Sequence, residues 1–318
     1  HEPPDAVTGT LPGALRDRIA AALEACLGKH VAIRGTRPAG GGCIHHAMVL
    51  DTTAGPLFLK WNRGDAGAAF RAEARGLDAL RSGAQAAGLL TVPQVLAVAD
   101  AEGEEPGFLV LEYLPPSDPG PGYPQRLGRG LAALHGAGWG SAFGWDEDNR
   151  IGSLEQPNPW TEAWPAFWRD ARLRPQMDAA FREGRLTPAD RDWSDAVLAA
   201  VEPALEPVAE DPPALVHGDL WSGNVHPGPN GGPVLVDPAV YLGHGEVDLA
   251  MAELFGGFGP EVFQAYAEVR PSPRGYAEVR RPLYQLYYLL AHVRLFGGGY
   301  LSGTRSAARA VLRACATR

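Results

Sequence analysis

The most informative segment of the sequence is HGDLWSGN, which runs from His217 to Asn224. It places an aspartate, Asp219, and an asparagine, Asn224, five residues apart in the pattern His-x-Asp-x-x-x-x-Asn. An apolar run over 234–236 follows and ends on Asp237, 13 residues after Asn224. A carboxylate at the end of a buried strand is poorly placed for packing but well placed to bind a metal ion. We therefore expect these three side chains to meet across a β-hairpin.

This spacing is typical of the catalytic loop of a phosphoryl-transfer enzyme. In such a loop the aspartate accepts the proton of the attacking hydroxyl, so Asp219 is the candidate catalytic base. The carbonyl oxygen of Asn224 and the carboxylate of Asp237 are the candidate Mg²⁺ ligands. The alternative is a turn aspartate beside a capping asparagine, each of which is common alone. Three such acceptors at this spacing argue against that alternative.

Lysine is almost absent from this sequence. Of 28 basic residues only Lys29 and Lys60 are lysines, so a lysine is a candidate for work that a planar guanidinium cannot do. Lys60 lies at the end of a predicted strand, and Glu73 follows 13 residues later on the apolar face of the next predicted helix. A carboxylate there is costly unless it is paired. We expect a Lys60–Glu73 pair that orients nucleotide phosphates; the alternative is a solvated residue at a strand end.

The order of the predicted elements indicates an α+β fold with two lobes. Residues 1–113 predict a small lobe with a five-stranded antiparallel sheet and one main helix. The strands are expected over 31–37, 47–51, 57–61, 95–100 and 108–112, and the helix over 66–82, after an opening helix over 11–27. The Pro- and Gly-rich segment 114–122 predicts a linker. Residues 114–318 as a whole predict a larger, mainly helical lobe.

Two further groups of residues are candidates for nucleotide contacts. Consecutive glycines follow the first predicted strand, and their backbone can approach phosphates closely. The last strand of the small lobe runs into the linker, where backbone groups would hydrogen-bond an adenine edge. These candidates are Gly40, Gly41, Gly42, Glu112, Tyr113 and Leu114. Cys43 follows the glycines and is either a small residue that suits a tight loop or a thiol whose oxidation switches the phosphate site off.

The composition excludes several classes of protein. Hydrophobic residues make up 45% of the 318 residues and charged residues 20%, which is typical of a globular protein. The net charge of −9 argues against nucleic acid and anionic membrane surfaces as partners and favours cationic small molecules. We predict a cytoplasmic protein from three features of the sequence. The three cysteines lack the spacing of a metal site, no apolar run is long enough to span a membrane, and the start shows no secretory pattern.

Longer motifs make the resemblance specific. Only eight residues separate Asp237 from the predicted helix at Glu246, which leaves no room for the activation segment of a protein kinase. The octet HGDLWSGN and the run VDPAVYLGHGEVDLAMAELFGGF over 236–258 resemble the fructosamine kinase (ketosamine kinase) family, which is protein-kinase-like and related to the aminoglycoside phosphotransferases. Three further motifs resemble the same family and follow in order along nearly the whole chain: GGCI over 41–44, QPNPW over 156–160 and LYQLYYLLAH over 283–292.

The resemblance implies an enzyme that uses ATP and Mg²⁺ to phosphorylate the 3-hydroxyl of a ketosamine sugar. The acceptor would be a fructosamine or ribulosamine, either as a small molecule or on a glycated protein lysine. Phosphorylation makes the adduct labile, so the implied role is deglycation. It also implies that Asp219 is the base and that Asp248 supports the catalytic-loop backbone, whereas a plain helix N-terminal aspartate is the alternative for Asp248.

The acceptor site is less well marked. Trp221 lies inside the catalytic loop and is a candidate for contact with the sugar or its cationic amine, or else a core residue that locks the loop. His244 and Glu246 follow Asp237 closely and are candidates for lining the acceptor site. Two other functions remain open. One is a kinase of a different hydroxylated amine, such as an aminoglycoside or choline, and the other is a nucleotide-binding protein without catalysis.

Overall fold

The computed structural model describes residues 11–39, 46–67 and 69–316. The chain divides into two compact units, which are considered separately below. The first consists of His1–Arg81 and Val92–Pro115, and the second of Ser82–Thr91 and Pro116–Arg318. Among the described residues, no helix is both long and apolar enough to cross a membrane.

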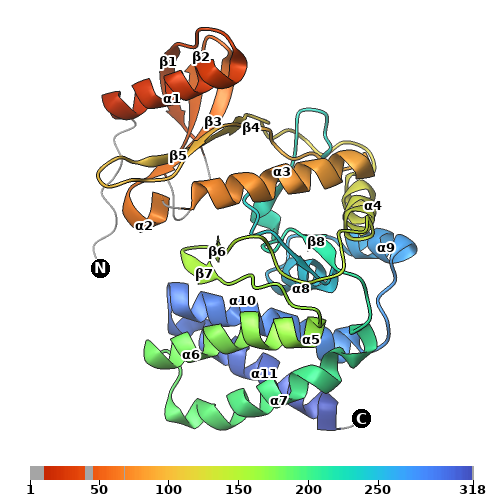
Figure 1. Cartoon of the computed structure of the whole chain (residues 1–318). Coiled ribbons are helices and arrows are strands. Elements are labelled where there is room, and N and C mark those ends of the chain that lie inside the picture. Colours follow the sequence, from red (N-terminus) through yellow and green to blue (C-terminus); the bar gives the residue numbers. More distant parts are fainter. Residues whose placement is uncertain (1–10, 40–45, 68, 317–318) are drawn as a thin grey trace. The chain divides into compact units, whose positions relative to one another are not determined.

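The first unit is built on a five-stranded antiparallel sheet in the order β1-β2-β3-β5-β4, which confirms the predicted sheet (Figure 1). The strands are β1 (Ile33–Pro38), β2 (His46–Thr52), β3 (Gly55–Asn62), β4 (Val95–Ala99) and β5 (Gly107–Glu112). Helix α1 (Gly13–Leu27) packs on this sheet through Leu15, Ile19 and Leu23, whose helical spacing places them on one buried face. The short α2 (Gly64–Gly67) leads into the predicted main helix, α3 (Phe70–Ala87), whose residues from Ser82 onward belong to the second unit.

The second unit is mainly helical, as predicted. Its α-helices are α4 (Tyr123–His135), α5 (Trp164–Phe167), α6 (Arg174–Arg182), α7 (Arg191–Leu205), α8 (Glu246–Leu254), α9 (Pro260–Val269), α10 (Arg281–Phe296) and α11 (Leu301–Ala316). π-helical turns over Trp168–Leu173 and Tyr276–Arg280 connect α5 to α6 and precede α10. Helix α10 is buried along most of its length, and α6, α8 and α11 pack against it. The aromatic core of this unit forms there.

Three small antiparallel sheets in the second unit position the loops between them. The predicted hairpin is β9 (Val225–Pro227) paired with β10 (Pro233–Leu235). Two further pairs were not predicted, because three-residue strands show no periodicity that a sequence could reveal. They are β6 (Asn149–Ile151) with β7 (Leu154–Gln156), and β8 (Ala214–Val216) with β11 (Tyr241–Gly243). Strand β8 leads into the HGDLWSGN stretch, and β11 begins four residues after Asp237.

Candidate active site

The HGDLWSGN stretch forms a loop between β8 and β9, and a second segment runs beside it from β10 to β11. The backbone N–H of Ala239 donates to the carbonyl of His217 at 2.8 Å, and that of Val236 donates to the carbonyl of Asn224 at 3.0 Å. These bonds join the two segments on both sides of Asp237. Asp219 and Asn224 therefore lie on one backbone segment, and Asp237 lies on the segment that is hydrogen-bonded to it.

Asn224 contacts the side chain of Asp219 and the backbone of Asp237. Its Nδ2 donates to the side-chain Oδ2 of Asp219 at 3.1 Å and to the Asp219 carbonyl at 2.9 Å. The same nitrogen lies 3.4 Å from the carbonyl oxygen of Asp237. These contacts all use Nδ2, so Oδ1 is the amide atom of Asn224 that is the candidate metal ligand. The asparagine thus orients the aspartate with one end of its amide and presents an oxygen ligand with the other.

Asp219 has the electrostatic environment of a base that works near neutral pH. Burial raises its pKa to about 7; the hydrogen bond from Asn224 opposes that shift, and the nearby charges of Asp237 and Asp248 add to it. A carboxylate poised near the working pH is an effective acceptor for the proton of a hydroxyl. This environment suits the predicted role of Asp219.

Asp237 adopts a backbone conformation that side chains avoid. Its φ is 54°, and among the described residues it is the one residue other than glycine with a positive φ. Such strain persists where the surrounding structure enforces it, and it is concentrated at functional sites. With the amide oxygen of Asn224, the carboxylate of Asp237 supplies hard oxygen donors. Mg²⁺ binds proteins through a few such donors and retains water and substrate oxygens, so the residues fit this ion.

Asp248 supports the catalytic loop from α8. The backbone N–H groups of His217 and Gly218 donate to its two carboxylate oxygens at 2.7 and 2.9 Å. The carboxylate is fully buried and lies 3.1 Å from Nε2 of His135, whose Nδ1 is 2.9 Å from the Tyr266 hydroxyl. Of the two interpretations left open for Asp248, the geometry therefore favours support of the loop. His135 and Tyr266 were missed, since their partners are distant in sequence.

The charge of Asp248 is retained despite its burial. Burial alone raises the pKa of this carboxyl, but the hydrogen bond and charge of His135, the charge of His217 and the Gly218 N–H together bring the pKa below its ordinary value. Helix α10 adds a further anchor, because the Tyr288 hydroxyl donates to the carbonyl of Gly218 at 2.8 Å. The loop backbone is thus held by side chains from two helices, α8 and α10, and His135 of α4 supports Asp248.

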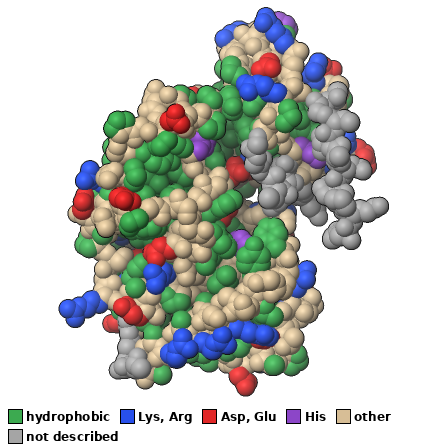
Figure 2. Space-filling view, turned by 180° about the vertical axis from the view of Figure 1, so that it is seen from behind, with side chains coloured by type: hydrophobic (Ala, Val, Ile, Leu, Met, Phe, Trp, Pro, Cys, Tyr) green, Lys and Arg blue, Asp and Glu red, His purple; other side chains and the backbone are tan. Residues whose placement is uncertain are grey.

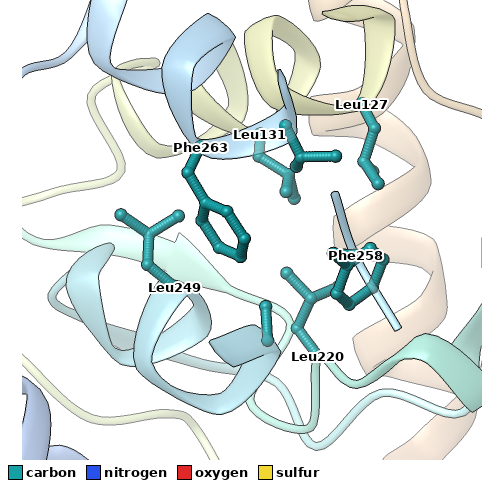
Figure 3. Close-up of a pocket in the computed structure, with 8 residues that line it drawn as sticks. Leu127, Leu131, Leu220, Leu249, Phe258 and Phe263 are labelled. Atoms are coloured by element: carbon teal, nitrogen blue, oxygen red, sulfur yellow. The ribbon is translucent and has the colours of Figure 1, made fainter. Parts of the chain in front are cut away.

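The loop is also anchored by an apolar contact. Leu220, the neighbour of Asp219, is fully buried and points into a small pocket lined only by apolar side chains (Figure 3). The other lining residues are Leu127, Leu131, Leu249, Ala252, Phe258, Val262 and Phe263. A pocket without polar groups is unsuited to a sugar. We interpret it as packing that fixes the direction of the Asp219 side chain.

Trp221 is 40% exposed, so it is not the core residue that was the alternative interpretation. Its indole lies over Gly223, where a Cβ would come within 2.2 Å of the ring. On the other side of the loop, a Cβ on Gly257 would come within 2.3 Å of the Ser222 Oγ. The segment after α8 therefore packs directly on the catalytic loop, and Trp221 stays exposed beside it.

His244 and Glu246 belong to a buried polar network. Both side chains are 3% exposed. Glu246 accepts two hydrogen bonds from the guanidinium of Arg280, at 2.7 and 2.8 Å, and Nε2 of His244 lies 3.0 Å from Asp211. Arg280 also donates to two backbone carbonyls, so each nitrogen of its buried guanidinium has an acceptor. This geometry favours a structural role for both residues over the predicted contact with an acceptor.

The first unit contains the predicted Lys60–Glu73 pair. The Lys60 ammonium donates to the Glu73 carboxylate at 2.7 Å, and Lys60 is only 6% exposed. Its strand, β3, lies between β2 and β5, which explains how a lysine is held in the sheet. This rules out the alternative of a solvated residue at a strand end.

The candidate adenine-binding residues lie where β5 ends. The Glu112 backbone N–H donates to the Gln94 carbonyl at 2.9 Å, and Arg37 lies over the ring of Tyr113 at 5.4 Å; Leu114 follows them. Their nucleotide contacts stay a prediction. Gly40, Gly41, Gly42 and Cys43 lie outside the described residues, so the phosphate loop and the redox hypothesis stay predictions as well.

Comparison with known proteins identifies the family of this chain. The family model described as fructosamine kinase matches residues 15–314. A protein of Synechocystis sp. named as a probable ketoamine kinase is 39% identical over 298 residues, which cover 93% of this chain and 96% of the relative. A chloroplastic protein-ribulosamine 3-kinase of Arabidopsis thaliana is 38% identical over 285 residues, 88% of this chain and 83% of the relative.

A solved structure extends the comparison to the fold. The crystal structure of a "putative fructosamine-3-kinase" from Thermobifida fusca is 37% identical, with a TM-score of 0.79 over 93% of this chain and 98% of that one. This similarity confirms the predicted kinase-like α+β fold. The sequence and structural matches together show that the chain belongs to the fructosamine kinase family.

Proposed function

We propose that this protein transfers the γ-phosphoryl group of ATP to the 3-hydroxyl of a ketosamine. Fructosamines and ribulosamines are the proposed acceptors, as small molecules or on glycated protein lysines, and the proposed role is deglycation in the cytoplasm. The observation that carries the proposal is the Asp219–Asn224–Asp237 arrangement, with the pKa of Asp219 raised to about 7, in a chain of this family.

The roles of the residues follow from their geometry. Asp219 accepts the proton of the attacking hydroxyl as the oxygen bonds to phosphorus, and Asn224 holds the carboxylate in place through Nδ2. The amide oxygen of Asn224 and the carboxylate of Asp237 would hold Mg²⁺, which when bound neutralises charge on the phosphates. Lys60, fixed by Glu73, orients the phosphates, because its compact ammonium acts as a point charge.

The acceptor chemistry agrees with the charge of the molecule. A ketosamine carries hydroxyls and a secondary amine that is cationic at neutral pH, and the net charge of the protein is −9. The exposed indole of Trp221 offers a face to the sugar or to this amine beside the base. The remaining loop side chains, Leu220 and His217, are buried and hold the loop.

An acceptor panel tests the proposal. ADP release from ATP would be measured with 1-amino-1-deoxyfructose, the corresponding ribulosamine and erythrulosamine, free fructose, an aminoglycoside and choline. The proposal predicts turnover with ketosamines alone, and its loss in Asp219→Asn. Turnover with the aminoglycoside or choline but with no ketosamine would overturn it in favour of a different hydroxylated amine. ATP binding without turnover of any acceptor would favour a nucleotide-binding protein.

A further inference from the structure

An exposed aromatic cluster surrounds His292 in the second unit. Its ring centroid lies 4.6 Å from that of Phe255, 5.3 Å from Phe296 and 5.0 Å from Tyr300. The surface shows hydrophobic side chains in several places (Figure 2). Among the described residues, the large ones with the greatest exposure include Phe255 at 40% and Phe296 at 56%. Exposed apolar side chains grouped in this way make the surface a candidate for ligand binding.

This aromatic cluster is connected to the catalytic loop in two ways. Phe255 is followed by Gly256 and Gly257, and Gly257 packs against Ser222, three residues after Asp219. His292 lies one turn beyond Tyr288 on α10, and its Nδ1 is 2.8 Å from the Tyr288 carbonyl. The Tyr288 hydroxyl in turn donates to Gly218 in the loop. The cluster is therefore built on the same two segments that hold the base in position.

We propose that the aromatic cluster of Phe255, His292, Phe296 and Tyr300 is the subsite for the amine part of the acceptor, and that it takes an aryl or long apolar amine substituent. The inference rests on the proposed function. In a ketosamine the amine is attached to C1 and the accepting hydroxyl to C3. The substituent therefore leaves the sugar within a few bonds of the reacting oxygen, and a surface that flanks the catalytic loop is placed to receive it.

The chemistry of the cluster suits this ligand. Ring faces attract an ammonium group through their quadrupole and stack with an aryl substituent. Burial lowers the pKa of His292, so its ring is neutral at pH 7 and does not repel the cationic amine. A single exposed ring that contacts an aryl group adds roughly 3- to 10-fold to affinity. The cluster would thus distinguish acceptors by their amine and not by their sugar.

Two acceptors with the same sugar test the subsite. Kinetic constants would be measured for 1-deoxy-1-(benzylamino)fructose and 1-deoxy-1-(methylamino)fructose with wild type, Phe296→Ala, Phe296→Tyr and Val269→Ala. Phe296 is more than half exposed, so its replacement should not unfold the protein. Val269 is 55% exposed, lies at the end of α9 outside the cluster and serves as the matched control.

The expected result is a higher kcat/KM of wild type for the benzyl adduct. Phe296→Ala should raise KM for that adduct roughly 3- to 10-fold, raise KM for the methyl adduct less, and leave kcat and the KM for ATP unchanged, whereas Phe296→Tyr restores the preference. If wild type phosphorylates both adducts with equal kinetic constants, and Phe296→Ala does not change them, the subsite is overturned but the proposed function stands. An equal loss for both adducts also overturns it, in favour of a structural role. If wild type phosphorylates neither adduct, the proposed function itself fails.

Discussion

Replacement of Asp248 by asparagine should uncouple the catalytic loop from its support while changing little of the side chain's shape. The wild-type carboxylate accepts two backbone N–H groups, one on each oxygen, and faces Nε2 of His135. An asparagine keeps one oxygen acceptor. Its NH₂ group then faces one of the two buried backbone N–H groups, that of His217 or that of Gly218. That N–H group is left without an acceptor.

The magnitude follows from the bonds that change. A hydrogen bond to a charged group contributes about 1.5–3 kcal/mol, and a buried donor left unsatisfied costs about 1–3 kcal/mol. Loss of the buried charge offsets part of this cost. We expect the free energy of unfolding to fall by about 2–4 kcal/mol. A shift of about 1 Å in the position of the Asp219 carboxylate would reduce kcat by roughly 10²-fold.

Urea unfolding and steady-state kinetics with ATP and a ketosamine measure both effects on the same protein. Glu268→Gln is the matched control, because Glu268 forms an exposed ion pair with Arg129 and should leave stability and kcat close to wild type. Support of the loop by Asp248 would be disproved if Asp248→Asn lost less than about 1 kcal/mol of unfolding free energy and kept more than half of kcat. In that case the loop would hold its position without this carboxylate.

Three further predictions concern single residues. Asp219→Asn should reduce kcat by at least ~10²-fold with an unchanged ATP Kd by calorimetry, and more than a tenth of wild-type activity would reject Asp219 as the base. Lys60→Arg should reduce kcat/KM for ATP at least ~10-fold. The control is Lys29→Arg, which changes the other, exposed lysine and should have no effect. Equal kinetics for the two variants would disprove the phosphate-orienting role of Lys60. Arg305 holds the pKa of Asp190 well below its ordinary value, so this pair stabilises the folded state above about pH 4, and the stabilisation is lost as pH falls further. We therefore expect the free energy of unfolding, measured in urea, to fall less between pH 7 and pH 3 in Arg305→Gln than in wild type. An equal fall in the two proteins would contradict this prediction.

The parts of the site that could be predicted depend on residues close together in the sequence. Asp219, Asn224 and Asp237 lie on two segments joined by one hairpin, and Lys60 and Glu73 lie on a strand and the helix that follows it. In both cases short-range geometry and the cost of burying a charge are sufficient to identify the partners. The five-stranded sheet follows in the same way, from runs of apolar residues separated by turn residues.

The parts that could not be predicted depend on contacts between distant segments. His135 and Asp248 are 113 residues apart, and only the packing of α4 beside α8 shows that the aspartate supports the loop. Proximity in sequence was misleading for Glu246, which pairs with Arg280 from a distant segment. The aromatic cluster was hidden for a related reason, since Phe296 at the end of a buried helix gives no sign that its ring reaches the surface.

The central claim is the transfer of phosphate to a ketosamine 3-hydroxyl with Asp219 as the base. It is tested most directly by incubating the protein with ATP, Mg²⁺ and 1-amino-1-deoxyfructose and recording coupled ³¹P–¹H NMR spectra of the product. We expect a new phosphomonoester whose phosphorus couples to the proton on C3, formed by wild type and absent with Asp219→Asn. Phosphate on another carbon, or equal product from Asp219→Asn, would contradict it.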